Sequence, residues 1–191
     1  MEPATRPLEL EPKVALTAAV LIPAEAVWEP IQAIRRRYDP QVRRWMPHVT
    51  LLYPFVPEGR LEEAVERLRR AGASIAAFEV TLADFGHFVH ERGSVTLWLR
   101  PEPAERVAAL QRALQGAMPW CDDVSRFAGG FAPHLSVGRF RGRVEAEQVA
   151  AELKAGWQPV RCAAADVALI ARSGRPEEPF SVRLRLPLGP V

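Results

Sequence analysis

The chain has 191 residues, of which 48% are hydrophobic and 25% are charged, and its formal net charge is +2. This composition excludes a disordered or collagen-like protein, and the small net charge excludes a protein that coats nucleic acid through its overall electrostatic field. The length predicts one compact domain, which we place over residues 14–191 after an N-terminal extension over residues 1–13.

Apolar periodicity, together with the positions of proline and glycine, divides the first part of the chain into alternating strands and helices. In chain order, we predict a strand over residues 14–22, a helix over 24–37, a strand over 48–53, a helix over 58–70, a hairpin over 78–89 and 94–99, and a helix over 104–115. Pro23 introduces the first of these helices, and Gly93 lies at the tip of the hairpin.

The second part of the chain repeats this pattern after an irregular stretch. We predict a strand over residues 131–140, a helix over 144–154, and strands over 160–171 and 180–186. Hairpins among helices favour an α+β domain with mainly antiparallel sheets over a doubly wound parallel one. The two similar halves predict a bilobed, pseudo-twofold-symmetric domain, in which helices flank two sheets and a central cleft separates the lobes.

The apolar segments and the cysteines indicate the cellular compartment of the protein. The apolar run over residues 14–22 is much shorter than the roughly 20 residues that a membrane-spanning helix needs. Residues 1–13 lack the basic start and the apolar centre of a secretory signal. Cys121 and Cys162 form no C-x-x-C motif, which fits reduced thiols. We therefore expect a cytoplasmic monomer that does not bind membranes.

Two of the four histidines share a local pattern, in which a hydroxyl residue stands two positions further on. His48 is followed by Thr50 and His134 by Ser136, and both histidines follow a proline and begin a predicted strand. Because side chains alternate between the faces of a strand, each imidazole shares a face with its hydroxyl, about 7 Å away. If the two strands lie side by side, two imidazoles and two hydroxyls surround a phosphate-sized pocket.

These groups fit the cleavage of a phosphodiester. That reaction needs a base for the attacking nucleophile, an acid for the departing oxygen, and donors for the non-bridging oxygens. Histidine suits both proton transfers, because its ordinary pKa near 6.5 allows a neutral and a protonated ring to coexist near physiological pH. The sequence leaves open which histidine is the acid and which is the base.

At these residues the sequence resembles the 2H phosphoesterase superfamily, which is named for two H-x-[ST] motifs in a bilobed fold. Its members include RNA 2′,3′-cyclic phosphodiesterases, also called 2′-5′ RNA ligases. The resemblance covers roughly residues 14–188. The first family motif, H-x-T-L followed by an aromatic residue, stands here at residues 48–53, and the second, H-x-T-L-x-R, stands at residues 134–139 with Ser136 in place of the commoner threonine. Residues 53–55, Tyr-Pro-Phe, depart from the usual phenylalanine-glycine continuation.

The resemblance implies that His48 and His134 are the catalytic acid and base, and that Thr50 and Ser136 hold the phosphate oxygens. It also implies that no metal or other cofactor takes part. The implied reaction opens the 2′,3′-cyclic phosphate of an RNA end or a small cyclic nucleotide to a 2′-phosphate. The reverse reaction would form a 2′-5′ linkage without ATP. The alternative is a non-catalytic nucleotide-binding module that retains the two-histidine pocket.

Tyr53 and Arg139 are two further candidates for substrate binding. Tyr53 would either stack on a nucleobase or belong to the core. Arg139 matches the arginine of the second family motif, but its five-residue spacing from His134 points it away from the imidazole if the strand is regular. Arg139 would then form a structural ion pair or reach a distal phosphate. We expect His87 and His90 to be surface histidines rather than metal ligands.

Overall fold

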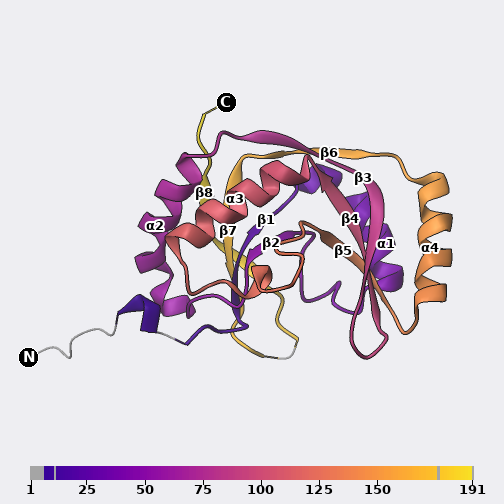
Figure 1. Ribbon diagram of the computed structural model, residues 1–191, viewed down its shortest axis with the longest axis horizontal. Helices are drawn as coiled ribbons and strands as arrows, with labels where there is room; N and C mark the ends of the chain where they lie inside the picture. Colours follow the sequence, from indigo (N-terminus) through magenta and orange to yellow (C-terminus); the bar gives the residue numbers. More distant parts are fainter. Residues whose placement is uncertain (1–6, 11, 176, 191) are drawn as a thin grey trace, which may run out of the picture.

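The computed structural model describes residues 7–10, 12–175 and 177–190 (Figure 1). Its strands and longer helices follow the predicted order. They are β1 (Thr17–Leu21), α1 (Trp28–Tyr38), β2 (Val49–Leu52), α2 (Leu61–Ala73), β3 (Phe78–Val89), β4 (Val95–Glu102), α3 (Ala104–Ala117), β5 (Leu135–Phe140), α4 (Arg143–Gly156), β6 (Val160–Ala164), β7 (Asp166–Ala171) and β8 (Ser181–Pro187). The predicted α+β class is confirmed.

The strands form two four-stranded sheets with orders β2-β1-β7-β8 and β5-β4-β3-β6, and all of the strand pairs within them are antiparallel. The two orders correspond to each other under a pseudo-twofold rotation that exchanges β2 with β5. These two strands each occupy one edge of their sheet, and they lie beside each other where the sheets meet (Figure 1). The strands that follow the two motif histidines are therefore neighbours.

Helices cover one face of each sheet and close a shared core. Helix α1 packs on β5 and α4 packs on β3, β4 and β5, whereas α2 packs on β7, β8 and α3 (Figure 1). The main hydrophobic core contains side chains from both sheets, among them Leu51 and Leu52 of β2 and Leu97 and Leu99 of β4. The opposite face of the first sheet carries a separate minor cluster, formed by Ala18, Val20, Ala168, Ile170 and Phe180. Each sheet therefore has one face in the main core and one face outside it.

The apolar run over residues 160–171, predicted as a single strand, is two strands that belong to different sheets. Residues up to Ala164 form β6 and pair with β3, whereas residues from Asp166 form β7 and pair with β1. The chain crosses from one lobe to the other at Ala165. Alanines at residues 163–165 join the two strands, and no proline or glycine marks the boundary, so the sequence pattern gives no sign of the crossing.

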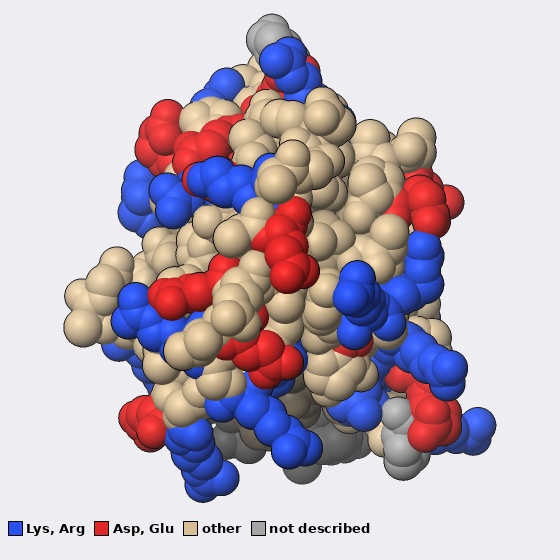
Figure 2. All heavy atoms as spheres, turned by 90° about the vertical axis from the view of Figure 1, so that its right-hand side faces the viewer, with Lys and Arg blue, Asp and Glu red and all other residues tan. Residues whose placement is uncertain are grey.

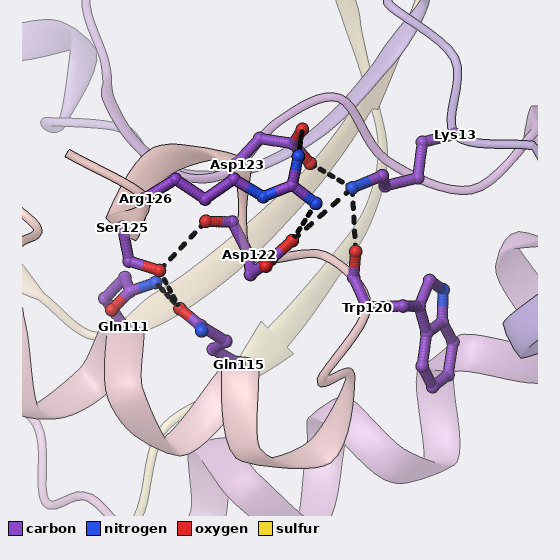
Figure 3. A network of polar contacts seen from close by, with 8 residues as sticks. All are labelled: Lys13, Gln111, Gln115, Trp120, Asp122, Asp123, Ser125 and Arg126. Atoms are coloured by element: carbon purple, nitrogen blue, oxygen red, sulfur yellow. Dashed lines mark hydrogen bonds and ion pairs between the residues drawn. The ribbon is translucent and has the colours of Figure 1, made fainter.

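Part of the expected N-terminal extension belongs to the fold. The Leu8 side chain is buried in the main core, and Lys13 contacts the segment that follows α3 (Figure 3). The Lys13 ammonium donates to the Trp120 carbonyl oxygen at 2.7 Å and forms ion pairs with Asp122 and Asp123. Residues 1–6 and 11 of the extension lie outside the described residues. These contacts attach the start of the chain to the segment that leads to the second histidine motif.

Charges of both signs are interspersed on the face of the molecule that carries α4 (Figure 2). On the face that carries α4, arginine and lysine side chains alternate with acidic ones (Figure 2). Several of these are ion pairs, including Arg143 with Glu147 at 2.7 Å and Lys154 with Asp84 at 2.8 Å. The described residues of this face therefore present no broad basic surface to a polyanion (Figure 2). In the described ranges, no helix has the length and the apolar character needed to cross a membrane.

Candidate active site

Each motif histidine lies immediately before an edge strand and is fixed in the same way. The Nδ1 atom of His48 lies 2.7 Å from the Met46 carbonyl oxygen, and Nδ1 of His134 lies 2.8 Å from the Ala132 carbonyl oxygen. Because a carbonyl oxygen can only accept a hydrogen bond, Nδ1 carries the proton in both rings. In the neutral rings, Nε2 is then the atom with a free lone pair, and it is the atom available for proton transfer.

Both motif strands contain a β-bulge at the third residue after the histidine. On β2, Thr50 pairs with Val20 and Leu52 pairs with Ala19, which leaves Leu51 as the extra residue. On β5, Ser136 pairs with Trp98 and Gly138 pairs with Leu97, which leaves Val137 as the extra residue. The two bulges occupy equivalent positions in the pseudo-symmetric halves. An extra residue shifts the alternation of side chains beyond it by one position.

The bulges place Tyr53 and Arg139 on the same faces as the motif hydroxyls. Thr50 pairs with Val20, which belongs to the minor cluster. Tyr53 packs against the same cluster, so it lies on the same face of the sheet as Thr50. Arg139 is exposed and pairs with Thr96, two residues from Trp98, the partner of Ser136. The expectation that Arg139 points away from His134 is therefore wrong, because it assumed a regular strand. No ion pair involves Arg139 within the described part of the chain, and its Nη2 donates to Ser94 Oγ at 3.3 Å.

His48 lies against an aromatic group that the motif analysis missed. Its ring stacks on Trp45, with ring centroids 4.6 Å apart and an angle of 18° between the planes. Trp45 also stacks on Phe180 and meets Tyr53 edge-on. Tyr53 is thus partly buried against this group, as expected of a core residue, and the rest of its side chain is exposed at the surface of the lobe. Burial lowers the pKa of His48 to about 4, with smaller contributions from the charges of Arg35 and His134.

His134 has a different aromatic environment on the second sheet. The Phe88 ring meets it edge-on, with centroids 4.9 Å apart, and the Trp98 ring lies 6.2 Å away. Burial lowers the pKa of His134 below its ordinary value of 6.5, and the hydrogen bond to Ala132 opposes this effect. Burial alone depresses the pKa here, whereas positive charge adds to burial at His48. His48 is therefore the ring that more strongly favours the neutral state.

The structure brings the two motifs together. Strands β2 and β5 are in contact, and the charge of His134 is close enough to His48 to contribute to its lowered pKa. Thr50 and Ser136 are half-buried and lie on the faces that follow from the two-residue spacing. The arrangement provides two proton-transfer groups, two hydroxyl groups and one exposed guanidinium, from Arg139. Such a set can hold a phosphate and move protons on both sides of it.

Arg35 is the second residue that the motif analysis missed. It lies on α1, it is only 2% exposed, and its Nε donates to Asp39 at 2.9 Å. The sequence does not show that Arg35 is buried, because a buried arginine and an exposed one can both pair with a carboxylate four positions further along a helix. The positive charge of Arg35 disfavours a second positive charge on His48. Arg35 is therefore a residue that influences His48 without belonging to either motif.

The other two histidines belong to neither motif and have polar partners of their own. His90 Nε2 lies 2.8 Å from Thr96 Oγ1, and His87 Nε2 lies 3.9 Å from a Glu147 carboxylate oxygen. Across the described residues, no three His, Cys, Asp or Glu side chains are grouped as ligands for a metal ion. Both cysteines are free thiols. Burial raises the pKa of Cys121 to about 11, and burial also holds the pKa of Cys162 above its ordinary value.

Gly86 on β3 makes room for the indole ring beside His134. A Cβ atom at this position would lie 2.2–2.6 Å from three carbon atoms of the Trp98 ring, far inside van der Waals contact. We predict that Gly86→Ala lowers the free energy of unfolding by about 1–3 kcal/mol through overpacking, and lowers activity because Trp98 and His134 shift together. Thermal unfolding and kcat measure the two effects.

The matched control is Gly116→Ala on α3, where an added Cβ meets no atom within 4 Å. Because Gly116 lies in a helix, alanine there should raise stability by about 0.5–1 kcal/mol. An unchanged melting temperature for Gly86→Ala would show that the Trp98 ring is not held against Gly86.

Comparisons with known proteins agree with this geometry. Residues 23–176 match the 2′-5′ RNA ligase superfamily. A protein of Geobacillus thermodenitrificans that carries the provisional name phosphoesterase is 28% identical over 140 residues, which cover 71% of this chain and 75% of that protein. Escherichia coli LigT, solved in complex with phosphate, has a TM-score of 0.60 and 19% identity, and the match covers 93% of this chain and 99% of LigT. TT0787 of Thermus thermophilus has a TM-score of 0.61 and 19% identity, with 92% and 98% covered.

The chain therefore belongs to the 2′-5′ RNA ligase superfamily. It has the LigT-like fold, and it is a phosphoesterase of the 2H type.

Proposed function

We propose that the protein is a metal-independent phosphodiesterase that opens the 2′,3′-cyclic phosphate of RNA ends or nucleotides to a 2′-phosphate. The observation that carries this proposal is the symmetric fixation of His48 and His134. Each ring donates Nδ1–H to a backbone carbonyl oxygen, and each stands beside a hydroxyl residue on neighbouring edge strands. The LigT structures in complex with phosphate and with 3′-AMP support a nucleotide substrate.

In the proposed reaction, His48 is the base and His134 is the acid. Neutral His48 takes a proton from water through Nε2, and the water oxygen forms a bond to phosphorus. The bond between phosphorus and the 3′-oxygen breaks, and protonated His134 delivers the proton from its Nε2 to that oxygen. The products are a 3′-hydroxyl and a 2′-phosphate, and solvent exchange returns both rings to their starting states. This assignment follows the pKa values, since His48 is the ring held more firmly in the neutral state.

In this proposal, Thr50, Ser136 and Arg139 bind the non-bridging oxygens, on which negative charge increases in the transition state. Tyr53 forms the wall beside the first motif. With a ribose 5′-hydroxyl in place of water, the same groups would let that hydroxyl attack the cyclic phosphate. The bond between phosphorus and the 3′-oxygen breaks, the 3′-oxygen takes the proton from His134, and a 2′-5′ linkage forms without ATP.

The test is turnover of 2′,3′-cyclic AMP and of an oligoribonucleotide with a cyclic phosphate end, in the presence of a chelator. The expected product is the 2′-phosphate, which chromatography separates from the 3′-phosphate. Tight binding of both compounds without any product would instead indicate a nucleotide-binding module. Formation of the 3′-phosphate would contradict the proposed direction of ring opening.

A further inference from the structure

An arginine outside both motifs lies next to His134. Arg100 is on β4, two residues after Trp98, so both side chains lie on the face of the sheet that carries Ser136. The last pair of the β4–β5 ladder joins Leu99 to Leu135. Arg100 follows Leu99 on β4, and His134 precedes Leu135 on the antiparallel strand, so Arg100 lies beside the backbone of His134. It precedes the second motif by more than thirty positions, so only the sheet register brings the two together.

The Trp98 indole connects Arg100 to the candidate active site. The guanidinium carbon of Arg100 lies 5.7 Å from the centroid of the Trp98 ring, and the His134 ring lies 6.2 Å from the same indole. Phe88 packs on Trp98 at 5.0 Å and on His134 at 4.9 Å. A cation beside an aromatic ring is attracted to it, and this attraction restricts the positions of a long side chain. Arg100 is therefore held beside His134, but its terminal group is not enclosed, because the side chain is exposed.

The guanidinium of Arg100 keeps its hydrogen-bond donors available. The charge of Arg100 contributes to the lowered pKa of its cross-strand neighbour Asp84, but the Asp84 carboxylate forms its ion pair with Lys154, at 2.8 Å. Among the described residues, Arg100 forms neither a hydrogen bond nor an ion pair of its own. An arginine with free donors in a planar fork is the side chain best suited to bind a phosphate oxygen pair.

We propose that Arg100 binds the phosphodiester that precedes the reacting phosphate, so that the site prefers the ends of RNA chains to cyclic mononucleotides. The inference rests on the proposed function, because it assumes that the reacting phosphate lies between His48 and His134. Arg139 lies beyond Ser136 and is the arginine that contacts the reacting phosphate in the proposed function, whereas Arg100 lies on the other side of His134. A cyclic mononucleotide has one phosphate and gains nothing from Arg100.

The test compares kcat/KM for a short oligoribonucleotide with a cyclic phosphate end and for 2′,3′-cyclic AMP. Arg100→Met removes the charge but keeps an aliphatic side chain on Trp98. We expect the ratio of kcat/KM for the oligoribonucleotide to kcat/KM for 2′,3′-cyclic AMP to fall about tenfold. Because one phosphate contact is lost, the slope of log(kcat/KM) against log[salt] for the oligonucleotide should become shallower by about 0.7. Arg100→Lys, which keeps the charge, should retain most of the ratio and the slope.

Arg161→Met on β6 is the matched control, because that arginine is exposed on the same sheet and two strands from Arg100. It should leave the ratio at the wild-type value. A wild-type ratio in Arg100→Met would overturn this inference and leave the proposed function standing. Failure of the wild-type protein to turn over either compound would overturn the proposed function instead. If Arg100→Met does not fold, as judged by circular dichroism, Arg100→Gln repeats the comparison with the same two outcomes.

Discussion

Replacing either motif histidine by glutamine should lower kcat by about 10²–10⁴ while leaving the fold intact. Glutamine is close to histidine in size and polarity, but it can neither accept a proton from water nor deliver one to a leaving oxygen at neutral pH. His48 and His134 are each only partly buried, and neither forms an ion pair in the described part of the chain. The measurement is steady-state turnover of 2′,3′-cyclic AMP, with circular dichroism and thermal unfolding as checks on the fold.

The matched control is His87→Gln. His87 lies on β3, and its ring faces Glu147 of α4 rather than the candidate site, so its replacement should leave kcat near the wild-type value. The variant with both His48 and His134 replaced should have a kcat only slightly below that of the less active single variant, because the two rings act in one step. Turnover at the wild-type rate in His48→Gln or in His134→Gln would contradict the assignment of acid–base roles to these residues.

The pH dependence of kcat/KM should be bell-shaped, with its maximum on the acid side of neutrality. The base, His48, must be neutral, so activity falls as the pH drops through its pKa of about 4. The acid, His134, must be protonated, so activity falls as the pH rises through its pKa, which burial holds below 6.5. Above that second pKa, kcat/KM should decrease tenfold for each pH unit. Negative charge on a bound phosphate favours both protonated rings, so the profile of kcat should lie at higher pH than that of kcat/KM.

Histidine titration by NMR gives an independent check of this assignment, since it reads each ring in the free protein. His48 should titrate at the lower pH. Arg35→Met removes a positive charge near His48, so it should raise the pKa of His48 and move the acid limb of the profile to higher pH. A lower pKa for His134 than for His48 would reverse the two roles.

The order of elements and the pairing of the two motifs follow from local sequence patterns. Strands and helices alternate with the predicted periodicities, and proline before each histidine marks the start of each edge strand. The crossing at Ala165 is different, because alanines occupy residues 163–165 and no proline or glycine marks the change of sheet. The helix predicted over residues 58–70 also ends later than the pattern indicates, because α2 continues through Gly72 to Ala73.

The positions of the residues around the histidines depend on the register of the strands in each sheet, which local sequence patterns do not predict. Two-residue spacing correctly places Thr50 and Ser136, because the strands are regular up to the bulges. Beyond the bulges the alternation shifts, so the orientation of Arg139 could not be predicted. Trp45 and Trp98 belong to neither motif, and only the assembled fold shows that each contacts one motif histidine.

The central claim is that both imidazoles act on a single phosphate group, and a crystal structure with a bound nucleoside 2′-phosphate tests it most directly. Both Nε2 atoms should lie within hydrogen-bonding distance of oxygens on that one phosphate, with the Thr50 and Ser136 hydroxyls on its remaining oxygens. A phosphate that contacts only one of the two rings, or that binds elsewhere on the protein, would contradict the account.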